Sequence, residues 1–235
     1  MSERNGLFLG ASSTVIGPAV LATIFLFAVP SFAARTPETD SSYMDNYSYA
    51  QHPAFGAIGS IPLDIHNASR IPITTGHAVP PPSGFIGFCV QHLQDCLATA
   101  PHPKTVQMTE ARRVELETVQ ISVNAQITPQ KNPSQVWGYA RNGSGDCNTY
   151  ALTKRQALMQ QGWPEEALLL AAVYDEIGEG HLVLVAHTDA GDFALDNRVR
   201  HVVDWRALPY QWISMQSQTS AGRWVQVVDA RGGQG

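Results

Sequence analysis

Residues Gly145–Asn197 read GDCNTYALTKRQALMQQGWPEEALLLAAVYDEIGEGHLVLVAHTDAGDFALDN. A helix is predicted from Cys147 to about Gln161, because Asp146 can cap its start and Gly162 suits the position after its end. Three strands should follow, since short turn-forming segments separate the next apolar runs. Their predicted ranges are Ala167–Tyr174, His181–Thr188 and Asp192–Asp196. The stretch therefore predicts a helix that packs on an antiparallel sheet.

The sequence on either side extends this pattern. Thr109 can cap a second helix with Glu110 in its first turn. Apolar residues recur there at spacings of three and four, which predicts one buried face formed by Leu116, Val119, Val123 and Ile127. Short strands are expected at Thr105–Met108 and at Trp224–Val228. Helices followed by an antiparallel sheet predict an α+β fold.

The first 33 residues have the features of a secretory signal peptide. No charged residue occurs from Leu7 to Ala34, and the apolar segment ends in a small-x-small pattern at Ser31–Ala33. The alternative is an uncleaved membrane anchor, because an uncharged segment of this length can span a bilayer. Residues 34–83 are expected to form an irregular arm, since Pro, Gly and Ser are frequent and no period is sustained. Residues 84–230 are then the folded domain.

Export would place the three cysteines in an oxidising compartment. Cys89 and Cys96 are seven residues apart and are expected to form a disulfide, which leaves Cys147 unpaired. An unpaired thiol is either reactive or buried and inert. The start of a helix favours the reactive form, because unsatisfied amide N–H groups and the helix dipole stabilise a thiolate.

Cys147, His181 and Asp196 occur in an order that suits nucleophilic catalysis. A thiol nucleophile needs a neighbouring base, and the base needs an acceptor that orients it. Taken singly, a histidine at a strand start or an aspartate before a turn usually has a structural role. Their occurrence together with an unpaired cysteine at a helix start favours a catalytic triad.

The hairpin register tests whether Asp196 can orient His181. With residues 188–191 as the loop, the pairing places Asp196 opposite Val183. Val183 lies two residues from His181 on the same face of its strand, and diagonal neighbours are within reach of each other's side chains. The predicted hairpin therefore permits the pair.

The same stretch resembles the bacterial transglutaminase-like cysteine peptidases, which include the LapG-type periplasmic proteases. The resemblance covers about residues 84–216, and its further segments are VWGYARNGSG, LETVQISVNAQI, WRALPYQW and the paired-cysteine segment GFCVQHLQDC. It implies a papain/transglutaminase-like fold with a catalytic triad. Its positions imply Cys147 as the nucleophile, His181 as the base and Asp196 as the orienting acid.

The resemblance also implies a protein substrate, calcium dependence and restraint by a regulatory receptor at the inner membrane. The family usually has two acidic residues after the cysteine that contribute to calcium binding, whereas this chain has Asn148 and Thr149. Calcium favours several oxygen ligands that include carboxylates, and here only Asp146 remains as a weak candidate ligand. We therefore expect no required cofactor and weak or absent calcium dependence.

Two groups are candidates to stabilise the oxyanion of the reaction. The first is the backbone N–H of Cys147, which points out of the helix start. The second is the indole of Trp137, ten residues upstream, because related transglutaminase-type enzymes use a tryptophan in this way. A core or cleft-wall aromatic is the alternative role for Trp137.

The composition excludes other classes of function. The net charge of −5 provides no basic patch, so nucleic acid is not an expected partner.

From the residue pattern and the resemblance together, we expect an exported, periplasmic cysteine peptidase that cleaves a periplasmic or surface protein through a thioester intermediate. The alternatives are an amidase or transglutaminase that uses the same triad, and a binding module that keeps the fold without turnover.

Overall fold

The computed structural model describes residues 70–97, 102–132, 134–140 and 142–228. The predicted signal segment 1–33 and most of the predicted arm 34–83 lie outside these residues.

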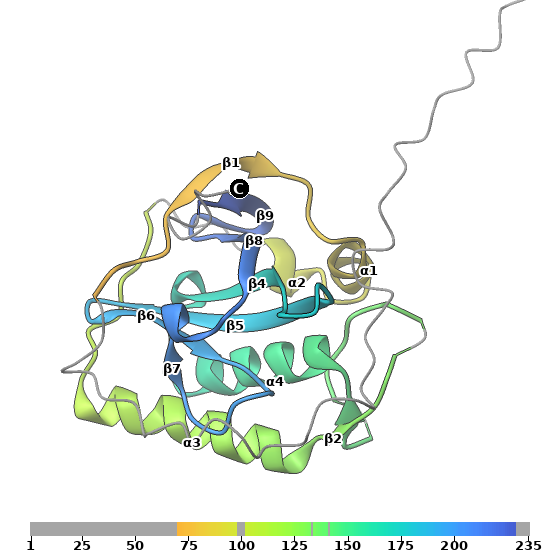
Figure 1. Cartoon of the computed structure of the whole chain (residues 1–235), viewed down its shortest axis with the longest axis horizontal. Coiled ribbons are helices and arrows are strands. Elements are labelled where there is room, and N and C mark those ends of the chain that lie inside the picture. The colour runs from red at the N-terminus through yellow and green to blue at the C-terminus, as the bar shows by residue number, and fades with distance from the viewer. Residues whose placement is uncertain (1–69, 98–101, 133, 141, 229–235) are drawn as a thin grey trace, which may run out of the picture. The chain divides into compact units, whose positions relative to one another are not determined.

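A seven-stranded antiparallel sheet forms the centre of the described chain, in the order β1-β9-β8-β4-β5-β6-β7 (Figure 1). The strands are β1 (Thr75–Val79), β4 (Leu168–Tyr174), β5 (Gly180–Thr188), β6 (Gly191–Leu195), β7 (Val203–Asp204), β8 (Gln211–Ser217) and β9 (Ser220–Val227). Almost every residue of β4 and β5 is buried, as their continuous apolar sequence predicts for strands covered on both faces.

The helices are α1 (Ser83–Gln91), α2 (Gln94–Leu97), α3 (Glu110–Gln126) and α4 (Cys147–Gln160), with 3-10 turns at Glu165–Ala167 and Trp205–Ala207. Helix α4 packs against β5, and α3 packs against the outer side of α4 (Figure 1). Two short parallel strands, β2 (Thr128–Pro129) and β3 (Ser144–Gly145), join the end of α3 to the start of α4. This arrangement is the predicted α+β fold.

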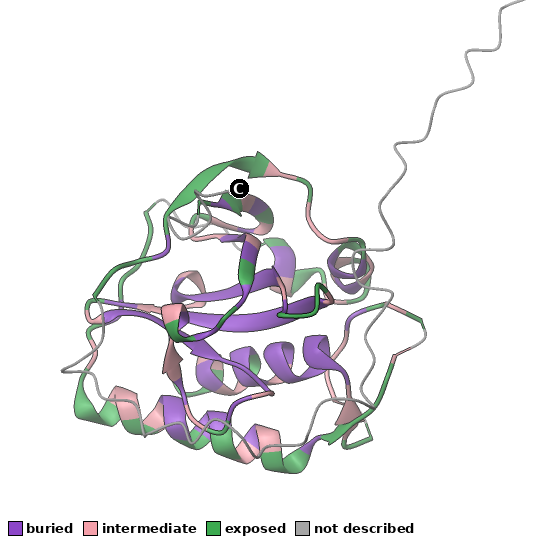
Figure 2. Ribbon diagram, viewed as in Figure 1, coloured by how far each residue is buried: buried purple, intermediate pink, exposed green. Residues whose placement is uncertain are grey.

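The core has one apolar cluster on each face of the sheet, and Figure 2 shows the buried residues concentrated in α4 and the central strands. Leu182 and Leu184 of β5 belong to the cluster that contains α4. Val183 and Val185 belong to the cluster on the opposite face. This alternation decides which face receives each site residue of β5.

The residues predicted to cap and to end the two long helices do so in the structure. The Thr109 side chain accepts a hydrogen bond from the Arg112 N–H at the start of α3. Asp146 caps α4, and Gly162 after its end has a φ of +81°, a conformation that favours glycine. The predicted pairing of β5 with β6 is also confirmed, because His187 lies opposite Asp192.

Two predictions of local structure are wrong. Thr75–Val79, within the predicted irregular arm, is the edge strand β1, because the distant strand β9 provides its pairing partner. Thr105–Met108 is not a strand, since Val106 alone forms an isolated parallel bridge with Thr188. The Met108 N–H instead donates to the Asp189 side chain at 2.8 Å.

The predicted disulfide is present. Cys89 in α1 and Cys96 in α2 are bonded, with their Cα atoms 5.7 Å apart. The sequence analysis did not predict these two helices or strand β8. Within the described residues, no helix combines the length and the apolar character needed to cross a bilayer.

Candidate active site

Cys147 is the first residue of α4 and is buried. The Asp146 carboxylate caps the helix by accepting a hydrogen bond from the Thr149 N–H at 3.1 Å. The backbone N–H of Leu182 favours the thiolate form of Cys147, so the sulfur lies near the residue that follows His181 in β5. Burial, followed by the charge of Asp146, raises the pKa of the Cys147 thiol above its ordinary value.

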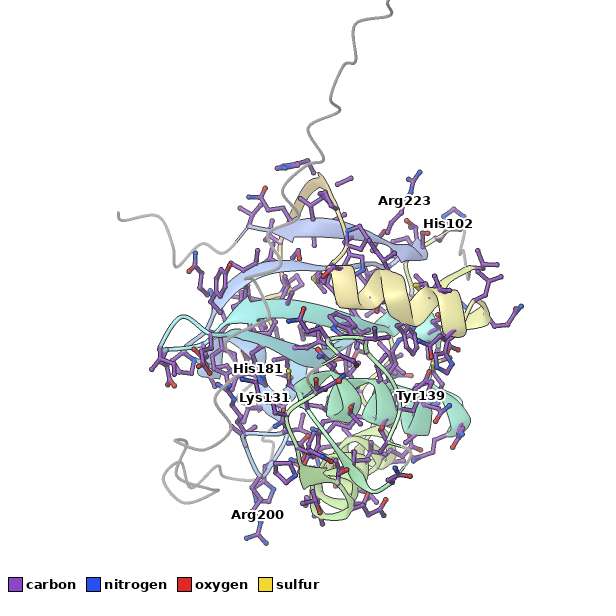
Figure 3. The ribbon with its side chains drawn as sticks, turned by 90° about the vertical axis from the view of Figure 1, so that its right-hand side faces the viewer. His102, Lys131, Tyr139, His181, Arg200 and Arg223 are labelled. Carbon is purple, nitrogen blue, oxygen red and sulfur yellow. A yellow bond between two sulfur atoms is a disulfide. The ribbon has the colours of Figure 1, made fainter. Side chains whose placement is uncertain are left out.

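His181 and Asp196 form a fully buried pair. His181 Nε2 and Asp196 Oδ1 are 2.8 Å apart, and neither side chain is exposed to solvent. His181, labelled in Figure 3, lies two residues before Val183 in β5 and therefore shares its face of the sheet, the one opposite α4. The pairing of β5 with β6 ends at Leu184 and Leu195. The structure therefore brings the Cys147 sulfur, His181 and Asp196 to the same end of β5.

Tyr210 is a residue of this site that the sequence analysis did not identify. Its hydroxyl donates to Asp196 Oδ2 at 2.6 Å. Its ring lies edge-on to the imidazole of His181, with the ring centroids 5.5 Å apart. Tyr210 lies within the WRALPYQW segment of the resemblance, but no local pattern distinguishes it from a core tyrosine.

The electrostatics of the pair follow from burial and hydrogen bonding. Burial opposes ionisation of Asp196, but the charge of His181 and the hydrogen bonds from His181, Tyr210 and the Arg198 N–H hold the pKa of Asp196 well below its ordinary value. Burial lowers the pKa of His181, and the charge of Asp196 acts in the opposite direction. An ionised Asp196 can only accept hydrogen bonds, so His181 Nε2 is the donor.

Two amide side chains of α3 hold the backbone that follows β6. Gln120 Nε2 donates to the carbonyl oxygens of Asp196 and Val199, each at 2.7 Å. Asn124, one turn later, donates to the same two oxygens at 3.2 and 3.1 Å. Gln120 lies on the buried face of α3 between Leu116 and Val123. A polar residue at a predicted core position was the signal in the sequence that could have identified it.

Arg198 forms an ion pair that connects the backbone after β6 to the turn between β4 and β5. Its Nη1 lies 2.8 Å from Asp175 Oδ2. Asp175 Oδ1 accepts hydrogen bonds from the N–H groups of Ile177 and Glu179, which closes the turn. Burial opposes ionisation of Asp175, but the contacts with Arg198 and these N–H groups hold the pKa of its carboxyl below the ordinary value. The ion pair thus links the segments that carry His181 and Asp196.

Trp137 is buried, with 2% of its surface exposed. Its ring packs edge-on against Phe85 at 5.8 Å and Trp224 at 6.2 Å between ring centroids. A Cβ atom at Gly84 would lie 2.3 Å from the indole Nε1, so glycine is required beside this ring. Trp137 therefore packs in the core, and its role as an oxyanion donor stays a prediction.

The sequence profile of the family described as bacterial transglutaminase-like cysteine proteinases matches residues 75–232. The chain belongs to this family. As a bacterial transglutaminase-like cysteine proteinase it is a cysteine peptidase, and its α+β fold is the one that the sequence analysis predicted.

Solved structures of LapG from Legionella pneumophila are similar to the chain. One is 19% identical, covers 48% of this chain and 68% of its own, and has a TM-score of 0.42. A calcium-bound LapG structure is also 19% identical, covers 55% of this chain and 77% of its own, and has a TM-score of 0.44. The comparison with curated proteins found no match.

The residues around Asp146 do not fit a calcium ion. Asp146 Oδ1 accepts hydrogen bonds from the N–H and the hydroxyl of Thr149, and Oδ2 accepts one from the Asn148 side chain at 3.1 Å. The described residues contain no group of three or more His, Cys, Asp or Glu side chains that could hold a metal ion. Calcium requires six to eight oxygen ligands, usually with several carboxylates. The Asp146 carboxylate instead holds the start of α4.

Chelation is therefore expected to leave the peptidase activity of this family member unchanged. The reason is that Asn148 and Thr149 donate hydrogen bonds to Asp146, whereas a calcium site would need acceptor oxygens at these positions. The measurement is the rate of substrate cleavage after dialysis against EGTA, with and without added calcium. A loss of activity that calcium restores, and magnesium does not, would contradict this prediction.

Proposed function

We propose that this protein is an exported cysteine peptidase that cleaves a periplasmic or surface protein, with Cys147, His181 and Asp196 as its catalytic residues. The observation that carries the proposal is the fully buried hydrogen bond between His181 and Asp196. It lies beside the residue whose backbone N–H favours the thiolate form of Cys147 at a helix start. A nucleophile, a base and an oriented acceptor in this order form the constellation that acyl transfer requires.

In the proposed reaction the Cys147 sulfur attacks the scissile carbonyl carbon while the thiol proton passes to His181. The new C–S bond forms as the carbonyl becomes an oxyanion, for which the Cys147 N–H and the Trp137 indole are the candidate donors. Collapse of this intermediate breaks the C–N bond, and His181 gives its proton to the leaving amine. Water then attacks the thioester with His181 as the base, which releases the acid and restores the thiol.

Asp196 has an electrostatic role in this proposal. Its low pKa keeps the carboxylate ionised, and because Asp196 contacts Nε2 of His181, the proposal assigns the thiol proton to the other ring nitrogen, Nδ1. The negative charge then stabilises the imidazolium that forms. The pKa of the Cys147 thiol is raised and the pKa of His181 is lowered, which favours a neutral thiol and imidazole before the attack. The proton therefore moves as the C–S bond forms.

Export and regulation are further parts of the proposal. The uncharged apolar segment and small-x-small pattern within residues 1–33 support export to the periplasm, with anchoring as the outcome if the segment is not removed. The disulfide between Cys89 and Cys96 is consistent with an oxidising compartment. Restraint by an inner-membrane receptor stays a prediction from the family.

The proposal is tested by exposing periplasmic and surface proteins of the producing bacterium to the purified wild-type protein and to a Cys147→Ala variant. Newly formed peptide N-termini are then identified by mass spectrometry. We expect at least one protein to be cut by the wild type only. Identical N-termini in the two samples would refute the proposed cleavage, provided that both proteins show the same thermal unfolding.

A further inference from the structure

A polar pocket of about 390 Å³ lies beside the proposed nucleophile. Gly145 and Thr149, which flank Cys147 at two residues on either side, are part of its lining. The rest comes from the end of α1 and from the segment between α3 and α4. A substrate whose scissile carbonyl meets the Cys147 sulfur would therefore place neighbouring residues in this pocket.

The pocket is unusual in its charge. Among the described residues that line it, Lys131 alone is charged, although the chain as a whole has 20 acidic and 15 basic residues. Two carboxylates outside the lining hold hydrogen bonds within the protein: Asp95 accepts one from the Tyr139 hydroxyl at 2.7 Å, and Asp146 accepts those that cap α4. Within the described part of the lining, a negatively charged side chain would thus meet one cation and no carboxylate.

Three lining groups are available to a ligand. The side chains of Lys131, Gln91 and Asn142 make no hydrogen bond or ion pair with the part of the chain that the structure describes. Lys131 is exposed and lines the pocket together with Tyr139; both are labelled in Figure 3. An ammonium group and two amides can donate hydrogen bonds to a carboxylate and to the backbone of an extended peptide.

We propose that this pocket is a substrate subsite that selects acidic residues near the scissile bond, with Lys131 as the residue that determines the specificity. This inference rests on the proposed peptidase function. The acidic side chain binds the Lys131 ammonium at the pocket rim, while the Gln91 and Asn142 amides contact the peptide backbone. Because Lys131 is exposed, the attraction is modest and screened by salt.

The test uses a peptide library made by digesting a bacterial proteome, which the wild-type protein and its variants then cleave. In the wild type we expect Asp and Glu to be enriched about fivefold on one side of the cleaved bonds, within four residues. Lys131→Glu should remove or reverse this enrichment, and Lys131→Gln should weaken it. The matched control is Lys104→Glu, which makes the same charge change at an exposed lysine that does not line the pocket. It should keep the wild-type preference.

The outcomes separate this inference from the proposed function. Cleavage that depends on Cys147 but shows no acidic preference, or the same preference in Lys131→Glu, would overturn the subsite and leave the peptidase intact. Absence of any cleavage that depends on Cys147 would overturn both. A preference that Lys131→Glu reverses and 0.5 M salt weakens would support the subsite, because an exposed ion pair is screened at that salt concentration.

Discussion

An Asp196→Asn variant is expected to lose about 10³- to 10⁴-fold in kcat/KM while it remains folded. The carboxylate of Asp196 lies 2.8 Å from His181 Nε2 in a site without solvent exposure. An amide of the same shape keeps the volume but removes the negative charge that stabilises the imidazolium. In a fully buried site no water replaces that charge, so most of the effect should appear in kcat.

Tyr210→Phe provides the matched control for this prediction. It removes the hydrogen bond of 2.6 Å to Asp196 Oδ2 but keeps the charge of the carboxylate and the ring beside His181. We expect a loss of about fivefold, because one neutral donor contributes roughly 1 kcal/mol to holding the carboxylate. Cleavage kinetics and thermal unfolding are measured for both variants. A folded Asp196→Asn variant with more than a tenth of wild-type kcat/KM would contradict a catalytic role for Asp196.

The parts of the fold that local sequence specifies were predictable. The hairpin of β5 and β6 has the predicted register, because the turn after Thr188 leaves one pairing that keeps the apolar residues of both strands buried. Thr109 and Asp146 fixed the starts of α3 and α4, since a capping side chain acts on N–H groups within three residues of itself.

The elements that the analysis missed depend on distant partners. Strand β1 pairs with β9, about 150 residues later in the chain, and its own five residues are mostly exposed. Nothing within TGHAV distinguishes an edge strand from a loop. The residues that support the site also depend on partners distant in the sequence. Gln120 and Tyr210 act on Asp196 from separate elements, so their roles follow from the fold rather than from spacing along the sequence.

A Lys154→Met variant is expected to be more stable than the wild type by roughly 3 kcal/mol at pH 7, about a hundredfold or more in the folding equilibrium. Lys154 lies in α4 with no exposed surface, and within the described residues its Nζ has no hydrogen-bond partner. The ammonium lies over the Tyr150 ring, 5.9 Å from its centroid. Burial lowers the pKa of Lys154 from 10.5 to about 7, although the charge of Asp196 acts against this shift.

The direction of the pH dependence follows from this shift. The unfolded lysine keeps its proton up to about pH 10.5, whereas the folded lysine releases it near pH 7. Between these values the unfolded state binds more protons, so the wild type becomes more stable as the pH rises. Methionine fills a similar volume without an ionisable group, with a packing cost of up to about 1.5 kcal/mol. The advantage of Lys154→Met should therefore fall by about 1.4 kcal/mol per pH unit between pH 7 and 10.

Urea unfolding of both proteins at pH 7, 8, 9 and 10 measures this difference. Lys104→Met serves as the control, because Lys104 is exposed and pairs only loosely with Glu166 at 3.7 Å. Its effect should stay within about 0.5 kcal/mol at every pH. If Lys154→Met destabilises the protein at pH 7, or its effect does not change with pH, the lysine is charged and bonded in the folded state. In that case the Lys154 ammonium neutralises part of the charge of Asp196, and removing it would leave this proposed catalytic carboxylate without that compensation.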